Sequence, residues 1–134
     1  MFLLDTNIWL ERLLDRRHSH AVGKMLDEIP TNEISLTDFS LYTIGLILCS
    51  MKKEEMYDVF VDDILINAHL KLYRLPLDKI SRLLQIMAQW NLDFDDAYQM
   101  AICETYNCTL VSYDRDFDRT QMGRTVPEKI MYQE

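Results

Sequence analysis

Four aspartates lie where the chain passes between predicted strands and helices: Asp5, Asp38, Asp96 and Asp114. If the fold brings these carboxylates to one edge of a sheet, they repel one another unless a divalent cation lies among them. Ligand sets made only of oxygen select hard cations such as Mg²⁺ or Mn²⁺. The chemistry that suits such a site is metal-assisted hydrolysis of a phosphodiester bond.

Other catalytic arrangements have little support in this sequence. No Ser-His-Asp or Cys-His combination presents itself, and His18, His20 and His69 stand in polar stretches that predict surface positions. Taken singly, each aspartate is explained equally well as a helix-start residue that caps the helix and favours its dipole. That explanation is strongest for Asp96, since Asp93 and Asp95 crowd the same helix start. It accounts less well for four carboxylates at one edge.

The elements that must position these acids alternate along the chain. Apolar runs predict strands at residues 2–4, 34–36 and 109–112, with a fifth strand at the edge over residues 129–132. Apolar residues that alternate with basic ones predict a further strand at residues 70–75. Helical spacing of apolar residues predicts helices over 7–17, 21–29, 38–50, 56–64, from 77 to about 90, and 95–106.

This alternation indicates an α/β fold with right-handed crossovers and a parallel sheet covered on both faces. In such a sheet ligands bind at the carboxyl ends of the strands. Asp5, Asp38 and Asp114 follow predicted strands, and Asp96 begins the helix that leads into the last one. The topology therefore predicts that all four meet at one edge.

Composition sets the broad class of the protein. The 134 residues are 49% hydrophobic, which predicts one globular domain spanning 1–134. The longest apolar run, residues 44–49, is far shorter than the roughly 20 residues of a membrane span, and no signal peptide is recognisable. Cys49 and Cys103 stand in apolar helical stretches, which favours buried, reduced thiols in a cytoplasmic protein and argues against a zinc site.

The net charge of −8 argues against broad adhesion to nucleic acid and suits a basic protein partner. It leaves room for a nuclease whose carboxylates hold metal. Apolar and aromatic residues are plentiful on the early helices, which predicts self-association as a homodimer.

Three segments, taken in order, resemble the PIN domain family. They are Leu4-Asp5-Thr6-Asn7 after a strand, Asp95-Asp96-Ala97 at a helix start, and residues 110–117, which run Leu-Val-Ser-Tyr-Asp-Arg-Asp-Phe. The resemblance is to small single-domain members, many of which are the ribonuclease toxins of VapBC toxin–antitoxin pairs. It implies a PIN-like three-layer sandwich with four to five parallel strands. It also implies a Mg²⁺-dependent endoribonuclease that acts on RNA and is neutralised by a small basic antitoxin.

Carried over by position, the resemblance implies that Asp5, Asp96 and Asp114 are the metal-binding and catalytic acids. Asn7 and Ser112 resemble polar residues that orient ligands or water. Asp116 resembles a further carboxylate for the same ion or a second one.

One position departs from the family pattern. The family places a glutamate near Thr43, and residues 37–45 contain none. Asp38 is the nearest acid, so we predict that it supplies the missing carboxylate, with a simple helix-start role as the alternative.

Two functions therefore stay open. The first is an active ribonuclease, and the second is a catalytically weak PIN-like module that binds protein or RNA. A phosphoacceptor receiver domain also gathers acids at a sheet edge. However, such domains carry an acidic pair after the first strand, where this chain has Asp5-Thr6-Asn7.

Overall fold

A single parallel sheet forms the centre of the molecule. The structure, a computed structural model, describes residues 1–131. Four strands pair in the order β3-β2-β1-β4, and all pairings are parallel. The strands are β1 (Phe2–Leu4), β2 (Ile34–Thr37), β3 (Lys71–Tyr73) and β4 (Thr109–Val111). In this register Leu3 of β1 lies between Ser35 of β2 and Leu110 of β4.

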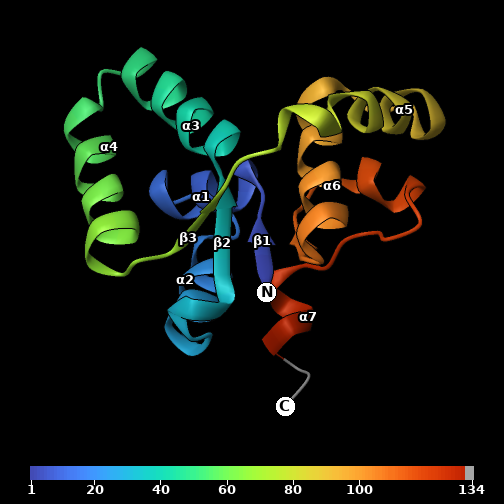
Figure 1. Ribbon diagram of the computed structural model, residues 1–134. Helices are drawn as coiled ribbons and strands as arrows, with labels where there is room; N and C mark the ends of the chain where they lie inside the picture. The colour runs from blue at the N-terminus through green and yellow to red at the C-terminus, as the bar shows by residue number, and fades with distance from the viewer. Residues whose placement is uncertain (132–134) are drawn as a thin grey trace.

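Helices cover both faces of this sheet, so the predicted three-layer α/β sandwich is confirmed (Figure 1). On one side lie α1 (Thr6–Leu13), α2 (Ser19–Glu28), α3 (Asp38–Ser50) and α4 (Glu54–Val61). On the other side lie α5 (Ile80–Trp90) and α6 (Phe94–Tyr106), which pack on each other. The last helix, α7 (Pro127–Met131), packs against α2.

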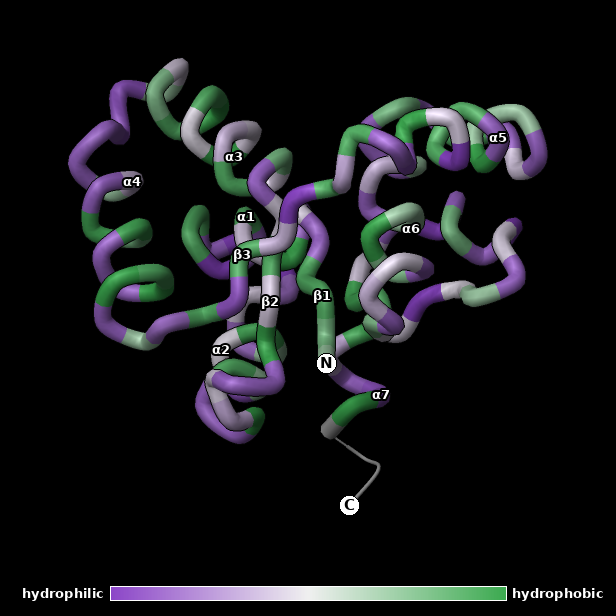
Figure 2. The backbone as a smooth tube through the Cα atoms, viewed as in Figure 1, coloured by the Kyte–Doolittle hydropathy of each residue, from purple (hydrophilic) through white to green (hydrophobic). Residues whose placement is uncertain are grey.

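Strand β1 is apolar on both faces because each face meets a helical layer. Successive side chains of a strand point to opposite faces of the sheet. Accordingly Leu3 belongs to the hydrophobic cluster beside α5 and α6, and Leu4 belongs to the cluster beside α1 to α4. Figure 2 shows hydrophobic residues along β1 in the middle of the molecule. A short continuous apolar run is therefore the right signal for this strand.

The end of the chain differs from the prediction. The expected fifth strand is wrong for residues 129–131, which belong to α7, and residue 132 lies outside the described residues. Pro127 begins that helix, where its fixed φ and missing N–H are tolerated. Within residues 1–131, only Thr125 extends the sheet edge, through an isolated parallel bridge to Val111.

Two smaller expectations also need correction. Cys49 is exposed, because it lies on α3 away from the face that buries Ile44 and Leu48, whereas Cys103 is buried as expected. His20 and His69 are exposed, but His18 is half-buried and stacks on the Tyr113 ring with a centroid distance of 4.0 Å. Among the described residues, no helix has the length and apolar character that crossing a membrane requires.

Candidate metal centre

A cavity of about 190 Å³ opens at the carboxyl edge of the sheet. Residues from the end of β1 and from α1, α3, α6 and the end of β4 line it: Asp5, Thr6, Asn7, Phe39, Thr43, Asp95, Asp96, Gln99 and Asp114. Three of the four predicted acids therefore meet here. The topology explains this, since β1 and β4 end at this edge and α6 begins there.

Asp5 is the most buried acid of the cavity, with 6% of its surface exposed. Its Oδ1 accepts hydrogen bonds from the Thr6 backbone N–H at 2.8 Å and from Gln99 Nε2 at 3.0 Å. Its Oδ2 accepts from Ser112 Oγ at 2.8 Å and from Asn7 Nδ2 at 3.3 Å. A carboxylate offers about four acceptor positions, so these four donors fix its orientation.

Asn7 and Ser112 also join the ends of β1 and β4 to each other. Asn7 Nδ2 donates to Ser112 Oγ at 3.1 Å, and Asn7 Oδ1 accepts from the Tyr113 N–H at 3.2 Å. Ser112 Oγ in turn accepts from the Asp114 N–H at 3.0 Å. These contacts set the start of the loop that carries Asp114.

Three further carboxylates converge above Asp5. Asp96, Asp114 and Asp116 can each place one oxygen within 4.8 Å of the others. Asp114 caps a short 3₁₀ helix, Arg115–Arg119, by accepting from the Asp116 N–H at 2.9 Å. Asp116 is further held by Arg119, whose Nη2 lies 3.1 Å from its Oδ1. The loop is thus shaped so that both of its acids face the helix start of α6.

Burial and mutual repulsion change the acidity of this group. Burial, followed by the charges of Asp95 and Asp114, raises the pKa of Asp96 to about 7. Burial also raises the pKa of Asp5, although its hydrogen bonds from Gln99 and Ser112 act in the opposite direction. The carboxylates that crowd this site repel one another, and a bound cation removes that repulsion, so the site favours binding one.

Comparison with other proteins identifies the family. The sequence profile of the PIN domain matches residues 2–122. This chain belongs to the PIN domain family. No curated protein matches it at the level of sequence.

Solved structures share the PIN fold of this chain at low sequence identity. A toxin–antitoxin complex from Klebsiella pneumoniae is 16% identical with a TM-score of 0.74, over 95% of this chain and 98% of that one. FitAcB from Neisseria gonorrhoeae is 19% identical with a TM-score of 0.72, over 96% and 99%. VapC20 from Mycobacterium tuberculosis, a toxin that cleaves the sarcin–ricin loop, is 12% identical with a TM-score of 0.75, over 93% and 97%.

Asp38 lies apart from the other acids of this PIN domain. It is not among the residues that line the cavity. Its Oδ1 accepts from the Tyr98 hydroxyl at 2.7 Å and from the Phe39 N–H at 2.7 Å. These contacts do not support the predicted role as a replacement acid. Thr43, where the family pattern has its glutamate, does line the cavity.

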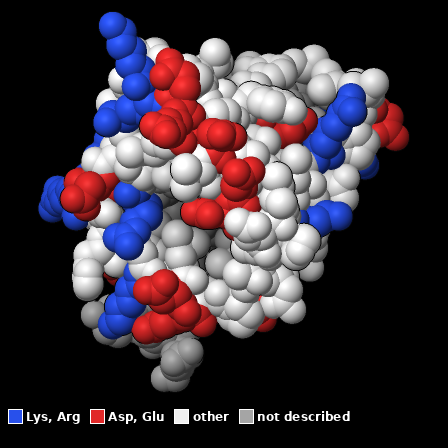
Figure 3. Space-filling model, turned by 90° about the vertical axis from the view of Figure 1, so that its left-hand side faces the viewer, with Lys and Arg blue, Asp and Glu red and all other residues white. Residues whose placement is uncertain are grey.

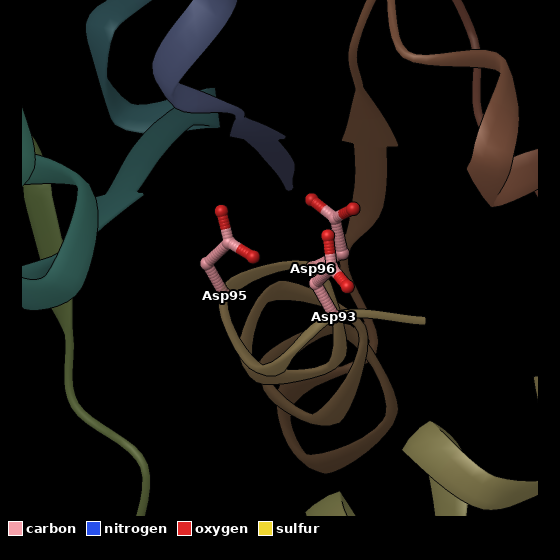
Figure 4. A group of neighbouring side chains, drawn as sticks. All are labelled: Asp93, Asp95 and Asp96. Carbon is pink, nitrogen blue, oxygen red and sulfur yellow. The ribbon is translucent and has the colours of Figure 1, made fainter. Parts of the chain in front are cut away.

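Asp95 and Gln99 line the cavity although they are not among the predicted site residues. Asp95 lies in the first turn of α6 on the side toward β2 and α3 (Figure 4). In the sequence, its position beside Asp96 indicates only a crowded helix start. Gln99 lies one turn after Asp96 and therefore on the same helix face. This spacing is the sequence signal that indicates Gln99 as a lining residue.

The donors of this cavity fit a hard divalent cation. All nearby charged ligands are carboxylates, and at least three of them can reach one point. A site for softer metals would need thiol or imidazole ligands, and the residues lining the cavity include neither Cys nor His.

Proposed function

We propose that this chain is a Mg²⁺- or Mn²⁺-dependent endoribonuclease and the toxin of a VapBC-type toxin–antitoxin pair. The observation that carries the proposal is the convergence of Asp96, Asp114 and Asp116 beside the buried Asp5 in a chain of the PIN family. The structural neighbours that are toxins or toxin–antitoxin complexes support the biological setting.

Each residue has a distinct part in the proposed reaction. Asp96, Asp114 and Asp116 would hold the ion together with Asp5, whose orientation is set by its four hydrogen bonds. Such an ion would supply charge neutralisation at the phosphate and would lower the pKa of an attacking water. Asn7 and Ser112 keep the two strand ends at a fixed separation, which holds Asp5 and Asp114 in register.

Cleavage of single-stranded or loop RNA by the purified protein tests this proposal. We expect cleavage with Mg²⁺ or Mn²⁺, none in excess EDTA, and none from Asp96→Asn with either ion. Undiminished cleavage in EDTA would contradict the metal mechanism. Retained cleavage by a folded Asp96→Asn variant would remove that residue from the site.

The proposed partner is a small basic antitoxin. On the face drawn in Figure 3, Asp and Glu side chains gather in a band across the middle, with Lys and Arg to either side. Such a surface, in a chain of net charge −8, suits a basic partner.

An apolar groove is the proposed binding site for that partner. The groove, of about 440 Å³, lies between α1, α2 and α4 and has Glu55 and Asp63 among its lining residues. The indole Nε1 of Trp9 is buried there and has no acceptor among the described residues. We propose that an apolar segment of the antitoxin fills the groove and packs on its apolar lining, which includes Met56 and Val59.

The groove is tested with the product of a short basic reading frame adjacent to this gene. Titration calorimetry should show that Val59→Asp, in the groove, weakens binding strongly, whereas Leu77→Asp does not. Val59 is 55% exposed and Leu77 is 76% exposed, so both changes are tolerated by the fold. Equal affinities for the two variants would place the antitoxin elsewhere.

The alternative function is a catalytically weak PIN module that binds protein or RNA. The observation that favours it is Thr43 at the cavity, where the family pattern has an acid. RNA binding without cleavage in either metal would support the alternative. We place either activity in the cytoplasm, where the buried thiols of Cys103 and Cys108 stay reduced.

A further inference from the structure

Three aromatic rings pack in series from the core to the surface, and the middle ring lines the acidic cavity. Tyr98, 8% exposed, packs beside Phe39 with ring centroids 5.3 Å apart. Phe39, half-buried, packs in turn beside Phe94 with centroids 6.1 Å apart. The interplanar angles are 36° and 39°, so the rings form a tilted series.

The inner end of this series is fixed by hydrogen bonds. The Tyr98 hydroxyl donates to Asp38 Oδ1 at 2.7 Å and accepts from the Leu75 N–H at 2.9 Å. Asp38 also accepts from the N–H of Phe39, which ties the backbone of the second ring to the same carboxylate. The acid nearest the departure from the family pattern therefore anchors aromatic side chains.

The outer end of the series lies beside the proposed metal ligands. Phe39 lines the cavity together with Asp96 and Asp114. Phe94 is the first residue of α6, directly before Asp95 and Asp96, and 44% of its surface is exposed. An exposed phenyl ring thus packs on Phe39, which lines the acidic cavity, and lies next in sequence to two acids of that cavity.

We propose that Phe94, supported by Phe39, is a stacking subsite for an unpaired nucleobase next to the scissile phosphodiester. This inference rests on the proposed ribonuclease function and names the form of its substrate as single-stranded RNA. Proteins recognise single-stranded RNA by stacking splayed bases on aromatic side chains. An acidic cavity repels the phosphate backbone, so affinity must come from the metal and from uncharged contacts such as stacking. A duplex keeps its bases stacked on one another and cannot use the ring.

A purely structural role for Phe94 is the competing explanation. The ring would then serve only to shield Phe39 from water. That role predicts a loss of stability when the ring is removed, and no dependence on which base of the RNA is present.

The test is binding of a short single-stranded RNA, measured by fluorescence anisotropy with Ca²⁺ in place of Mg²⁺. A series of otherwise identical RNAs carries one abasic nucleotide at each position in turn. Wild type should lose about tenfold in affinity when the stacked base is missing, a typical value for one aromatic–base contact. Phe94→Leu should bind the intact RNA about tenfold more weakly and be insensitive to the abasic position, while Phe94→Tyr should behave as wild type.

Tyr106→Leu is the matched control, because Tyr106 is 39% exposed at the other end of α6 and stacks on Tyr73. It should keep the abasic sensitivity of wild type. Melting temperatures of all variants identify any variant that fails to fold. If Phe94→Leu fails to fold, the abasic series measured on wild type and Phe94→Tyr still tests the subsite.

The outcomes separate this inference from the proposed function. Equal abasic sensitivity in wild type and Phe94→Leu, or none in wild type at any position, overturns the stacking subsite even if RNA is cleaved. If wild type is sensitive to one abasic position and Phe94→Leu is not, but wild type cleaves no RNA in Mg²⁺ or Mn²⁺, the result supports the subsite and overturns the ribonuclease proposal.

Discussion

Gln99 Nε2 lies 3.0 Å from Oδ1 of Asp5, and both side chains are almost fully buried. The same nitrogen donates to Ser40 Oγ at 2.7 Å, and Gln99 Oε1 accepts from Thr37 Oγ1 at 2.8 Å. One neutral amide therefore links the ends of β1 and β2, through α6, at the floor of the metal centre. It gives the buried carboxylate a donor without introducing a positive charge that would compete with a cation.

Replacing Gln99 with Leu should destabilise the protein by about 1–3 kcal/mol, because buried polar groups lose their partner. The affinity for Mn²⁺ should also fall, since Asp5 is no longer held in place. Urea denaturation and calorimetric titration measure the two effects. Gln89→Leu, on the exposed side of α5, is the control and should change stability by less than about 0.5 kcal/mol. Equal effects of the two substitutions would show that the Asp5–Gln99 contact is unimportant.

Asp114→Asn and Asp116→Asn should each weaken Mn²⁺ binding by about tenfold or more, since a neutral amide is a poorer ligand for a hard cation. The secondary structure should be retained, because both residues lie in a surface loop that is not fully buried. Asp78→Asn, an exposed acid on a different segment, serves as the control. Wild-type affinity in both loop variants would exclude this loop from the metal centre.

The metal-free protein should lose stability as the pH rises from about 4 to about 7. The pKa of Asp96 is raised from 3.8 to about 7, so the folded protein holds a proton that the unfolded chain releases at lower pH. The stabilisation present below the unfolded pKa is lost as the pH rises through the folded value. Asp5, whose pKa is also raised, contributes with the same sign.

The comparison that isolates Asp96 is urea denaturation of wild type and Asp96→Asn in EDTA across this range. The stability of the variant relative to wild type should increase with pH. A constant difference between the two proteins would contradict the proposed burial of charge.

Asp38→Asn should leave Mn²⁺ affinity unchanged, because Asp38 lies with Tyr98 and Phe39 outside the residues that line the cavity. It should lower stability by about 1 kcal/mol through weaker hydrogen bonds to Tyr98 and to the helix start. Calorimetric titration and urea denaturation report the two quantities. A parallel loss of metal affinity and cleavage would instead restore Asp38 as the replacement acid.

The protein should be a dimer in solution, with α3 at the interface. Tyr42 and Leu46 lie one turn apart on α3 and are 65% and 74% exposed. Light scattering should give the mass of two chains for wild type and of one chain for Leu46→Glu. Leu77→Glu, at a similarly exposed leucine, should remain dimeric. A monomeric wild type at micromolar concentration would reject the homodimer.

Much of this fold follows from the sequence alone. The alternation of predicted strands and helices predicts the parallel sheet, because a helix that connects two strands crosses over and joins them in parallel. Topology then brings Asp5, Asp96 and Asp114 to one edge, wherever the intervening helices lie. The wrongly predicted fifth strand is a local error. Ile130 and Met131 are apolar and are compatible with a strand, but Pro127 starts a helix that packs on α2 instead.

Only the tertiary structure decides what lies between these acids. Asp38 and Asp95 look alike in sequence, as acids at helix starts, yet Asp38 bonds Tyr98 while Asp95 lines the cavity. Gln99 shares a helix face with Asp96, which the sequence indicates, but its hydrogen bond to Asp5, 94 positions away, is decided by the packing of the two elements. Such contacts depend on the positions of individual side-chain atoms. The packing of α6 against the sheet sets those positions, and sequence periodicity does not.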